Sequence, residues 1–368
     1  MTKSKKKLNT NNTNNYVAMS LFSGLGGDTQ GLEQCGINVK YYSEFVPVFC
    51  ESHEANFPHS ELIGKDVKSD ISKISDDTLK KYSDIDILFA GFPCQGFSQA
   101  GKKMDDDPRN TLFREFLRVA KITQPSMIIG ENVKGLLSRK TTSGENYIDV
   151  IVNEFTNLGY NVKYKVMKAH KHNVPQKRER LIIVGVKEND YNWESKHPDD
   201  LHNEPNLINI VKYSMEGTVK VDDSLFDGIP ENCILSDLED ETDESSNSHP
   251  YLLSKLYPKD NQLTYNGKTY TNLFSFGKRD SPIHCEIIDI RNPCKTIICS
   301  YDHQPRFFVP IKNKKGCYLR CLLPDELKQI QGFPDNYILK GNWKQQVVQI
   351  GNAVPPPLIK SVVENIIK

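Results

Sequence analysis

The sequence predicts an α/β fold with a mostly parallel sheet and helices on both faces, followed by a smaller irregular domain. Between about residue 16 and residue 187, short apolar runs alternate with helical stretches, which is typical of parallel strands joined by crossover helices. From roughly residue 188 to residue 315 this alternation is lost, and Pro, Asn, Asp and Ser become frequent. The six candidate strands are 17–22, 37–43, 85–90, 126–130, 161–168 and 180–186.

The clearest connecting helix follows the turn-forming stretch DDDPRN. Leu112, Phe113, Phe116, Leu117 and Ala120 are spaced so that they share one face of this helix. Order returns near the end of the chain, where LPDELKQIQGF is predicted to be helical, GNAVPPP to turn, and residues 358–367 to form a closing amphipathic helix. The first 15 residues are polar and rich in Asn and Lys, so we expect a disordered tail there.

The composition excludes some classes of protein. The chain has 368 residues, enough for one large and one smaller domain, and its 47 basic and 47 acidic side chains balance, so any nucleic-acid surface must be local. Nine cysteines without regular spacing, and no apolar run near the roughly 18 residues of a membrane helix, predict a reduced, cytoplasmic protein. Cys317 and Cys321 are interpreted as buried thiols, and no metal is expected.

A glycine-rich turn, FSGLGGDTQGL, follows the first strand. Gly24, Gly26 and Gly27 allow the backbone to turn tightly and approach a ligand, although such turns are about as often structural. Glu44, at the end of the second strand, can accept hydrogen bonds from ribose hydroxyls, with a plain surface acid as the alternative. Asp66 can accept from an adenine amino group, with helix capping as the alternative. Together these residues predict an adenosyl ligand across the strand ends.

A second group of reactive side chains follows the later strands. In GFPCQGFSQAGK, Cys94 follows a proline in a glycine-flanked turn at the end of a strand, where open α/β sheets bind ligands, although most cysteines are inert and buried. SMIIGENV ends in Glu131 and Asn132, and a thiol and a carboxyl from neighbouring strand ends would make a nucleophile and a general acid. The alternative for Glu131 is a capping acid in a loop. In QKRERLIIVG, Arg178 and Arg180 can face one side of a strand, with surface charge as the alternative.

With these motifs the chain resembles the C5-cytosine DNA methyltransferase family over about residues 16–187 and 317–360. LFSGLGGDTQGL is similar to the family's first motif, GFPCQGFSQAGK to its nucleophile motif, ENV to its glutamate motif, QKRERLIIVG to its arginine motif, and QGFPDNY and GNAVPPPL to its last two. The resemblance implies a Rossmann-like S-adenosylmethionine-dependent methyltransferase fold. Residues 16–187 would form the catalytic and cofactor-binding domain, residues 188–315 the target-recognition domain, and residues 316–368 a segment completing the catalytic domain.

The resemblance also implies a reaction. C5 of cytosine is a poor nucleophile, so Cys94 would add to C6 while Glu131 donates a proton to N3, which activates C5 to take a methyl group from S-adenosylmethionine. Arg180 would hold the cytosine O2, and Arg178 would stabilise the Cys94 loop and the charge developing on the ring. Asn132 would position the loop that carries the nucleophile.

By the same resemblance, the cofactor pocket would combine residues from both ends of the chain, with an aromatic ring on the adenine and a carboxylate on the ribose. The expected pocket residues are Phe22, Gly24, Gly26, Glu44, Asp66, Pro93, Leu112, Asn352 and Val354.

Duplex DNA is the expected substrate, with the target base flipped into the pocket. Gln95 and Ser98 lie in a glycine-containing loop beside the nucleophile, which we expect to close over DNA. Lys278, Arg279 and Arg306 are expected to contact DNA from the target-recognition domain.

Two other functions are considered. A transfer-RNA methyltransferase of the same chemistry would carry a Cys-Phe-Thr element where this chain reads TIICSYDHQ, which favours DNA. The other is a catalytically silent DNA-binding relative, although Cys94, Glu131 and Arg180 are all present. A restriction endonuclease acting on the same site is a candidate partner, no membrane contact is expected, and a monomer is the family default. The acidic run over residues 237–244 should face away from phosphate.

Overall fold

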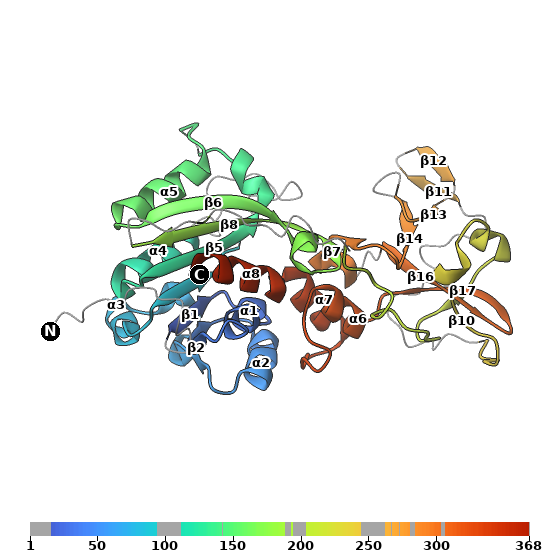
Figure 1. Ribbon diagram of the computed structural model, residues 1–368, viewed down its shortest axis with the longest axis horizontal. Coiled ribbons are helices and arrows are strands. Elements are labelled where there is room, and N and C mark those ends of the chain that lie inside the picture. The colour runs from blue at the N-terminus through green and yellow to red at the C-terminus, as the bar shows by residue number, and fades with distance from the viewer. Residues whose placement is uncertain are drawn as a thin grey trace. The chain divides into compact units, whose positions relative to one another are not determined.

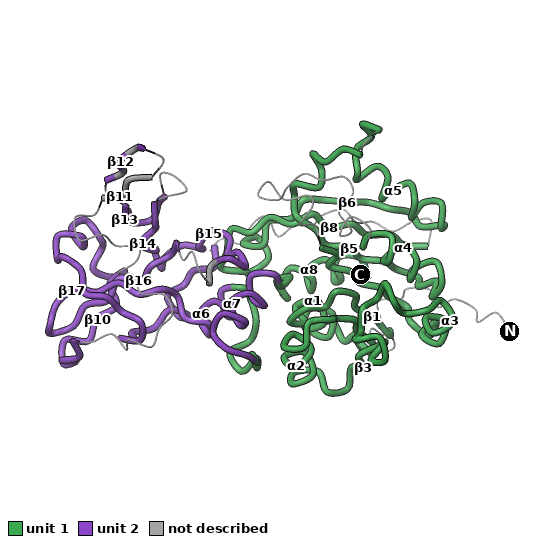
Figure 2. The backbone as a smooth tube through the Cα atoms, turned by 180° about the vertical axis from the view of Figure 1, so that it is seen from behind, with its two compact units in different colours: residues 1–202, 331–340, 353–368 green, residues 203–330, 341–352 purple. Residues whose placement is uncertain are grey.

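The computed structural model divides the chain into two compact units (Figure 2). Unit 1 holds residues 1–202, 331–340 and 353–368, and unit 2 holds residues 203–330 and 341–352. The structure describes residues 16–93, 112–141, 143–187, 193, 204–243, 262–265, 267–271, 273–279, 284–302 and 306–367. Of the predicted closing segment, residues 331–340 and 353–368 lie in unit 1 and residues 316–330 and 341–352 in unit 2.

Unit 1 contains a seven-stranded sheet in the order β3-β2-β1-β4-β5-β8-β6 (Figure 1). All six predicted strands are confirmed, and the short β3 was not predicted. The strands of unit 1 are β1 Val17–Leu21, β2 Asn38–Ser43, β3 Glu61–Leu62, β4 Ile87–Ala90, β5 Met127–Val133, β6 Asn161–Lys168, β7 Gln176–Lys177 and β8 Glu179–Val186. The helices are α1 Gly27–Glu33, α2 Pro47–Asn56, α3 Asp76–Leu79, α4 Leu112–Thr123, α5 Tyr147–Asn157 and α8 Pro356–Ile367.

The sheet is mostly parallel, as predicted, but β8 runs in the opposite direction to its two neighbours. β3, β2, β1, β4 and β5 run parallel to one another, whereas β8 pairs antiparallel with both β5 and β6. The connection from β6 to β8 runs only from Lys168 to Glu179, which is too short for the helical crossover that parallel strands need. The reversal is therefore a consequence of loop length.

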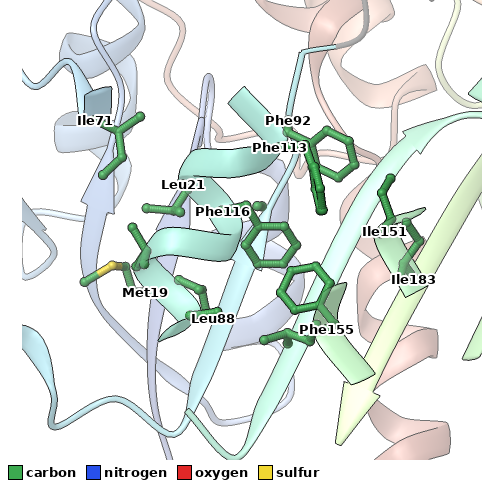
Figure 3. Packing of buried hydrophobic residues seen from close by; sticks show 14 of the residues in the cluster. Met19, Leu21, Ile71, Leu88, Phe92, Phe113, Phe116, Ile151, Phe155 and Ile183 are labelled. Carbon is green, nitrogen blue, oxygen red and sulfur yellow. The ribbon is translucent and has the colours of Figure 1, made fainter. Parts of the chain in front are cut away.

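Successive residues of the buried strands alternate between two hydrophobic layers, because side chains in a strand point to opposite faces. Leu88 of β4 packs in the layer that contains Phe116 of α4 and Phe155 of α5 (Figure 3). Its neighbour Phe89 packs in the opposite layer, with Leu358 of α8. The sheet is thus covered on both faces, which is the arrangement that the apolar strand sequences predict.

Unit 2 is built on a mixed sheet in the order β13-β14-β16-β17-β9, with β10 paired to β16. Its strands are β9 Val219–Lys220, β10 Leu235–Asp237, β11 Gln262–Tyr265, β12 Lys268–Thr271, β13 Phe274–Phe276, β14 Cys285–Ile287, β15 Cys294–Lys295, β16 Phe307–Asn313 and β17 Gly316–Cys321. Its helices are α6 Pro324–Ile330 and α7 Trp343–Asn352. Cys317 and Cys321 are both buried in β17, as predicted. The sequence did not reveal this sheet, because most of its strands have four residues or fewer.

The acidic run forms hydrogen bonds and ion pairs within unit 2. The Tyr213 hydroxyl donates to Asp240 at 2.7 Å, and the Tyr318 hydroxyl donates to Asp243 at 2.7 Å. Asp243 also pairs with the Lys220 ammonium at 3.1 Å. These carboxylates are therefore matched by donors of their own unit.

Among the helices that the structure describes, none combines the length and the apolar character needed to cross a membrane.

Truncating Phe116 is expected to destabilise the fold strongly. The Phe116 ring is fully buried and lies 4.9 Å from the Phe155 ring, so Phe116→Ala leaves a cavity and should lower the free energy of unfolding by about 3–5 kcal/mol. Tyr164 on β6 is 40% exposed, so Tyr164→Ala is a control that should change the free energy of unfolding by only about 0.5 kcal/mol. Urea unfolding measures both, and equal losses would contradict this description of the core.

Candidate active site

The first five strands of the sheet end at one edge because they are parallel. The segments that leave this edge carry most of the predicted site residues. Phe22 follows β1, Glu44 follows β2, Asp66 follows β3, Pro93 follows β4, and Glu131 lies near the end of β5. The structure therefore brings these five residues to a common edge of unit 1.

The glycine-rich turn has an unusual backbone. Phe22 has φ +56°, a left-handed conformation that is rare for an aromatic residue, and Gly24 and Gly26 have φ +54° and +87°. Among the described residues, no heavy atom lies within 4 Å of where a Cβ of Gly24 would be, so the backbone there leaves room for a ligand. At Gly26 a Cβ would lie 2.8 Å from the His53 ring, so this residue is glycine for packing reasons.

Glu44 is a buried carboxyl rather than a surface acid. Its carboxyl accepts hydrogen bonds from the backbone N–H groups of Gly24 at 2.9 Å, Phe45 at 2.9 Å and Val46 at 2.8 Å. The residue is only 8% exposed. Burial raises the pKa of Glu44, and the three N–H donors oppose that shift. These contacts fix the carboxyl against the glycine-rich turn.

Phe45 was not identified from the sequence. This side chain is 62% exposed although it is large and apolar, and it directly follows the buried Glu44. An apolar residue of this size after a strand end was the available signal. Asp66 is exposed in a short 3₁₀ turn, Lys65–Val67, whose N-cap position belongs to Gly64 rather than to Asp66.

The segment expected to carry the nucleophile lies outside the described residues, and this includes Cys94, Gln95 and Ser98. The chain that leads into it is held firmly. The Asn132 side-chain amide donates to the Phe92 carbonyl at 3.2 Å, and the Phe92 ring is buried against Phe116 of α4. Leu112, half-buried, is the first residue of α4.

Glu131 and Arg180 form a partly buried ion pair. The Arg180 Nε atom lies 2.8 Å from Glu131 Oε1, and their side chains are 13% and 11% exposed. The other oxygen, Oε2, would be 3.8 Å from a Cβ on Gly91, the residue after β4. Arg180 therefore binds one carboxyl oxygen while the other lies near the chain that leads to Cys94.

Arg178 lies in a different environment from Arg180. It is 2% exposed, and its guanidinium donates to the Ala353 carbonyl at 3.1 Å. The buried Gln331 amide donates to the same carbonyl at 2.5 Å and accepts from Gln176 at 2.5 Å. Gln176 and Gln331 were missed from the sequence although both begin quoted motifs, because a motif does not reveal that two glutamines meet.

These bonds hold the segment that contains Val354. A Cβ on Gly91 would lie 3.8 Å from the Val354 side chain, and one on Gly27 would overlap the Val354 carbonyl oxygen. Val354 thus lies against both the glycine-rich turn and the end of β4. Asn352, which is exposed, is the last residue of α7 and belongs to unit 2.

A buried polar network below the glycine-rich turn was also missed. Asp28 is 2% exposed and accepts a hydrogen bond from the Ser20 hydroxyl, and the Ser23 hydroxyl lies 3.5 Å from its other oxygen. Burial raises the pKa of Asp28 to about 7. Thr29 Oγ1 continues the network to His53 Nε2 at 3.1 Å. A single acid in a helix that begins after a glycine turn gave no sequence signal of burial.

In unit 2, the predicted DNA-contacting residues lie next to the ends of two strands, β13 and β16, of the same sheet. Lys278 and Arg279 are exposed and follow β13, and Arg306 precedes β16 and is half-buried. β14 lies between β13 and β16 in the sheet. Burial lowers the pKa of Arg306, and the charge of Arg279 lowers it further, which indicates that the two guanidinium groups are near each other.

Comparison with known proteins identifies a family. The model of the C-5 cytosine-specific DNA methylase family matches residues 16–368. Type II methyltransferase M1.HphI of Haemophilus parahaemolyticus is 31% identical over 359 residues, which cover 95% of this chain and 86% of the relative. Type II methyltransferase M.Eco47II of Escherichia coli is 30% identical over 364 residues, covering 96% and 79%.

Solved structures share the fold. A DNMT2 mutant from Spodoptera frugiperda superimposes with a TM-score of 0.63 at 16% identity and covers 96% of this chain and 100% of its own. The Dnmt2 methyltransferase of S. pombe superimposes on this chain with a TM-score of 0.61 at 16% identity. The match covers 95% of this chain and 97% of the S. pombe protein. At these identities the likeness concerns the fold alone.

Replacing Asp28 by Asn is expected to alter the pH dependence of stability. The pKa of Asp28 is about 7 in the folded protein against an ordinary 3.8, so its contribution to stability is complete below about pH 3.8 and is lost as pH rises through 7. The Asp28→Asn variant, which cannot ionise here, should therefore gain stability relative to the native chain between pH 5.5 and 9, by about 2 kcal/mol at most. Urea unfolding across this range measures the difference, and a difference independent of pH would contradict the expectation.

Proposed function

Because the chain belongs to the C-5 cytosine-specific DNA methylase family, we propose that it transfers a methyl group from S-adenosylmethionine to C5 of a flipped cytosine in duplex DNA. The observation that carries this proposal is the Glu131–Arg180 ion pair at the sheet edge, beside the chain that leads to Cys94. An acid held by a guanidinium, next to a thiol, is what activation of a cytosine ring requires.

The residues at the sheet edge fit an adenosyl group. Glu44 presents a buried carboxyl to ribose hydroxyls, while the exposed Phe45 and the strained Phe22 offer aromatic faces to an adenine. The open backbone at Gly24 permits close approach, and Asp66 is exposed and able to accept from the adenine amino group. When bound, S-adenosylmethionine would supply the methyl group. The remaining proposed pocket residues are Gly26, Pro93, Leu112, Asn352 and Val354.

In the proposed mechanism, the Cys94 thiolate forms a bond with C6 of cytosine, and the electron pair of the C5–C6 double bond moves into the ring. Glu131 donates a proton to N3, which prevents negative charge from building up on the base. After C5 has been methylated, a base or water takes the proton at C5, the bond between Cys94 and C6 breaks, and the proton on N3 returns to Glu131. The thiolate is then regenerated and the ring is aromatic again.

Arg180 positions the acid in this mechanism. Its bond to Oε1 restrains the Glu131 carboxyl and leaves Oε2 to deliver the proton. We assign Arg180 also to the cytosine O2, Asn132 to the chain before Cys94, and Arg178 to the Ala353 carbonyl that holds Val354.

We propose that unit 2 carries target recognition. Lys278, Arg279 and Arg306 supply positive charge next to β13 and β16 of its sheet, and phosphate and base edges are recognised by such groups. Gln95 and Ser98, close to the nucleophile in sequence, would contact the DNA around the flipped base. A restriction endonuclease of the same specificity is the proposed partner, and a monomer the proposed active form.

Transfer of labelled methyl groups tests the proposed function. We expect label from S-adenosylmethionine to appear as 5-methylcytosine in duplex DNA and not in transfer RNA, and to be absent with Cys94→Ser, because an alcohol is a poor nucleophile here. Digestion to nucleosides identifies the product. Label in transfer RNA alone would favour an RNA methyltransferase, and transfer to neither would favour a silent DNA-binding protein.

Arg180→Lys is expected to lower kcat/KM for DNA methylation by about 100-fold, because an ammonium cannot replace the Nε contact and hold the base as well. The matched control is Lys134→Met. It removes the exposed ion pair that Lys134 forms with Glu179 at 3.0 Å, and should change kcat/KM less than about twofold. Equal losses in the two variants would show that Arg180 has no special role.

A further inference from the structure

Asp28 is directly connected to the glycine-rich turn. It is the second residue of α1, and its carboxyl lies close to the hydroxyls of Ser20 and Ser23. Ser23 belongs to the turn itself, where its N–H donates to the Ser43 carbonyl at 3.0 Å and its own carbonyl accepts from Gly26 at 2.8 Å. The charge on Asp28 is therefore located just beneath the backbone proposed to hold S-adenosylmethionine.

The hydrogen-bond partners of this carboxyl in the described chain are uncharged. β1 and the turn contribute the hydroxyls of Ser20 and Ser23, and the start of α1 contributes the backbone N–H groups of Asp28 and Thr29. From α2, His53 reaches the network through Thr29 and is neutral, because burial lowers its pKa to about 3. Tyr337 is neutral as well, because burial raises its pKa, and its hydroxyl donates to the Leu25 carbonyl.

The other titratable groups of neighbouring elements do not form a close ion pair with Asp28 in the structure described. Glu33 on α1 pairs with His59, and Glu44 after β2 binds backbone N–H groups. α8 packs against α1 through Ile359, and its charged residues Lys360 and Glu364 follow that contact along the chain. Among the described residues, no cationic side chain forms an ion pair with Asp28 that would compensate the burial of its charge.

We propose that Asp28 makes the glycine-rich turn discriminate by charge between S-adenosylmethionine, a sulfonium cation, and S-adenosylhomocysteine, the uncharged thioether left after methyl transfer. This inference rests on the proposed function. The cationic donor stabilises the ionised carboxyl beneath the turn, whereas the product does not. Asp28 is a positioning residue in this arrangement, since it acts through the turn and the electric field rather than by contact with the ligand.

Linkage sets the size of the effect. A cation within about 10 Å of a buried carboxylate, at an effective dielectric constant of about 20, favours the charged state about tenfold. By reciprocity, the ionised carboxyl should strengthen binding of the donor over the product by the same factor. Discrimination therefore increases as Asp28 loses its proton, and donor binding near neutral pH releases part of a proton.

The test compares the dissociation constants of S-adenosylmethionine and S-adenosylhomocysteine by calorimetry between pH 5.5 and 9, using the full chain. In the native protein we expect preference for the donor to rise about tenfold over this range. In Asp28→Asn we expect it to change less than about twofold, because Asn does not titrate. Titrations in buffers of different ionisation enthalpy should detect proton release on donor binding in the native protein only. The amino groups of the two ligands contribute equally to the measurements on the native protein and on Asp28→Asn, so the difference between the two proteins reports on Asp28.

Glu33→Gln is the matched control, since it removes a carboxyl from the same helix without touching the turn, and it should retain the pH dependence. Ser20→Ala provides a second variant should Asp28→Asn fail to fold: loss of its hydrogen bond to the charged carboxyl should move the pH dependence to higher pH. A preference that is flat in the native chain, or that rises equally in Asp28→Asn, overturns the role of Asp28 alone. Binding of neither ligand by the native chain overturns the proposed function with it.

Discussion

The antiparallel pairing of β5 with β8 determines where the charged side chains of the site lie. Its register sets Val133 opposite Arg180 and Glu131 opposite Ile182, so that the guanidinium reaches diagonally to the carboxyl on the neighbouring strand. A shift of one residue would turn Arg180 to the other face of the sheet. Because the apolar residues of both strands are buried on both faces, such a shift is prevented by the core. The short connection between β6 and β8, which makes β8 antiparallel, therefore also helps to determine the position of the Glu131–Arg180 ion pair.

The hydrophobic core extends this control to the nucleophile segment. Phe92 is buried among aromatic rings of α4, and its carbonyl accepts the side chain of Asn132. The chain is consequently fixed on both sides two residues before Cys94. Asn132 is next to Glu131 in β5, so the same strand positions the acid and the start of the nucleophile segment.

Periodic features of the sequence predicted most of unit 1, and the motifs pointed to the residues at its edge. Strands such as 161–168 were evident because apolar side chains recur in them over enough residues to form a pattern. The contact of Gln331 was not evident, because it depends on a segment that is distant in sequence. Gln331 meets Gln176 across 155 positions, for example, and no local pattern encodes this contact. The sheet of unit 2 was missed for a different reason, since most of its strands have only two to four residues and are too short to display a period.

The two acids around the glycine-rich turn illustrate how burial produces different chemistry from the same functional group. Both Glu44 and Asp28 lose solvent, which raises the pKa of each carboxyl. Glu44 is compensated by three backbone N–H donors, which suits a permanent acceptor for hydroxyl groups. Asp28 accepts from the hydroxyls of Ser20 and Ser23, which can reorient when the carboxyl gains or loses a proton, and the backbone N–H groups of Asp28 and Thr29 also lower its pKa. Glu44 therefore contacts the turn at Gly24, and Asp28 contacts it at Ser23. In the proposed arrangement, Glu44 would bind the ribose at every pH, whereas Asp28 would respond to the charge on the sulfur of the ligand.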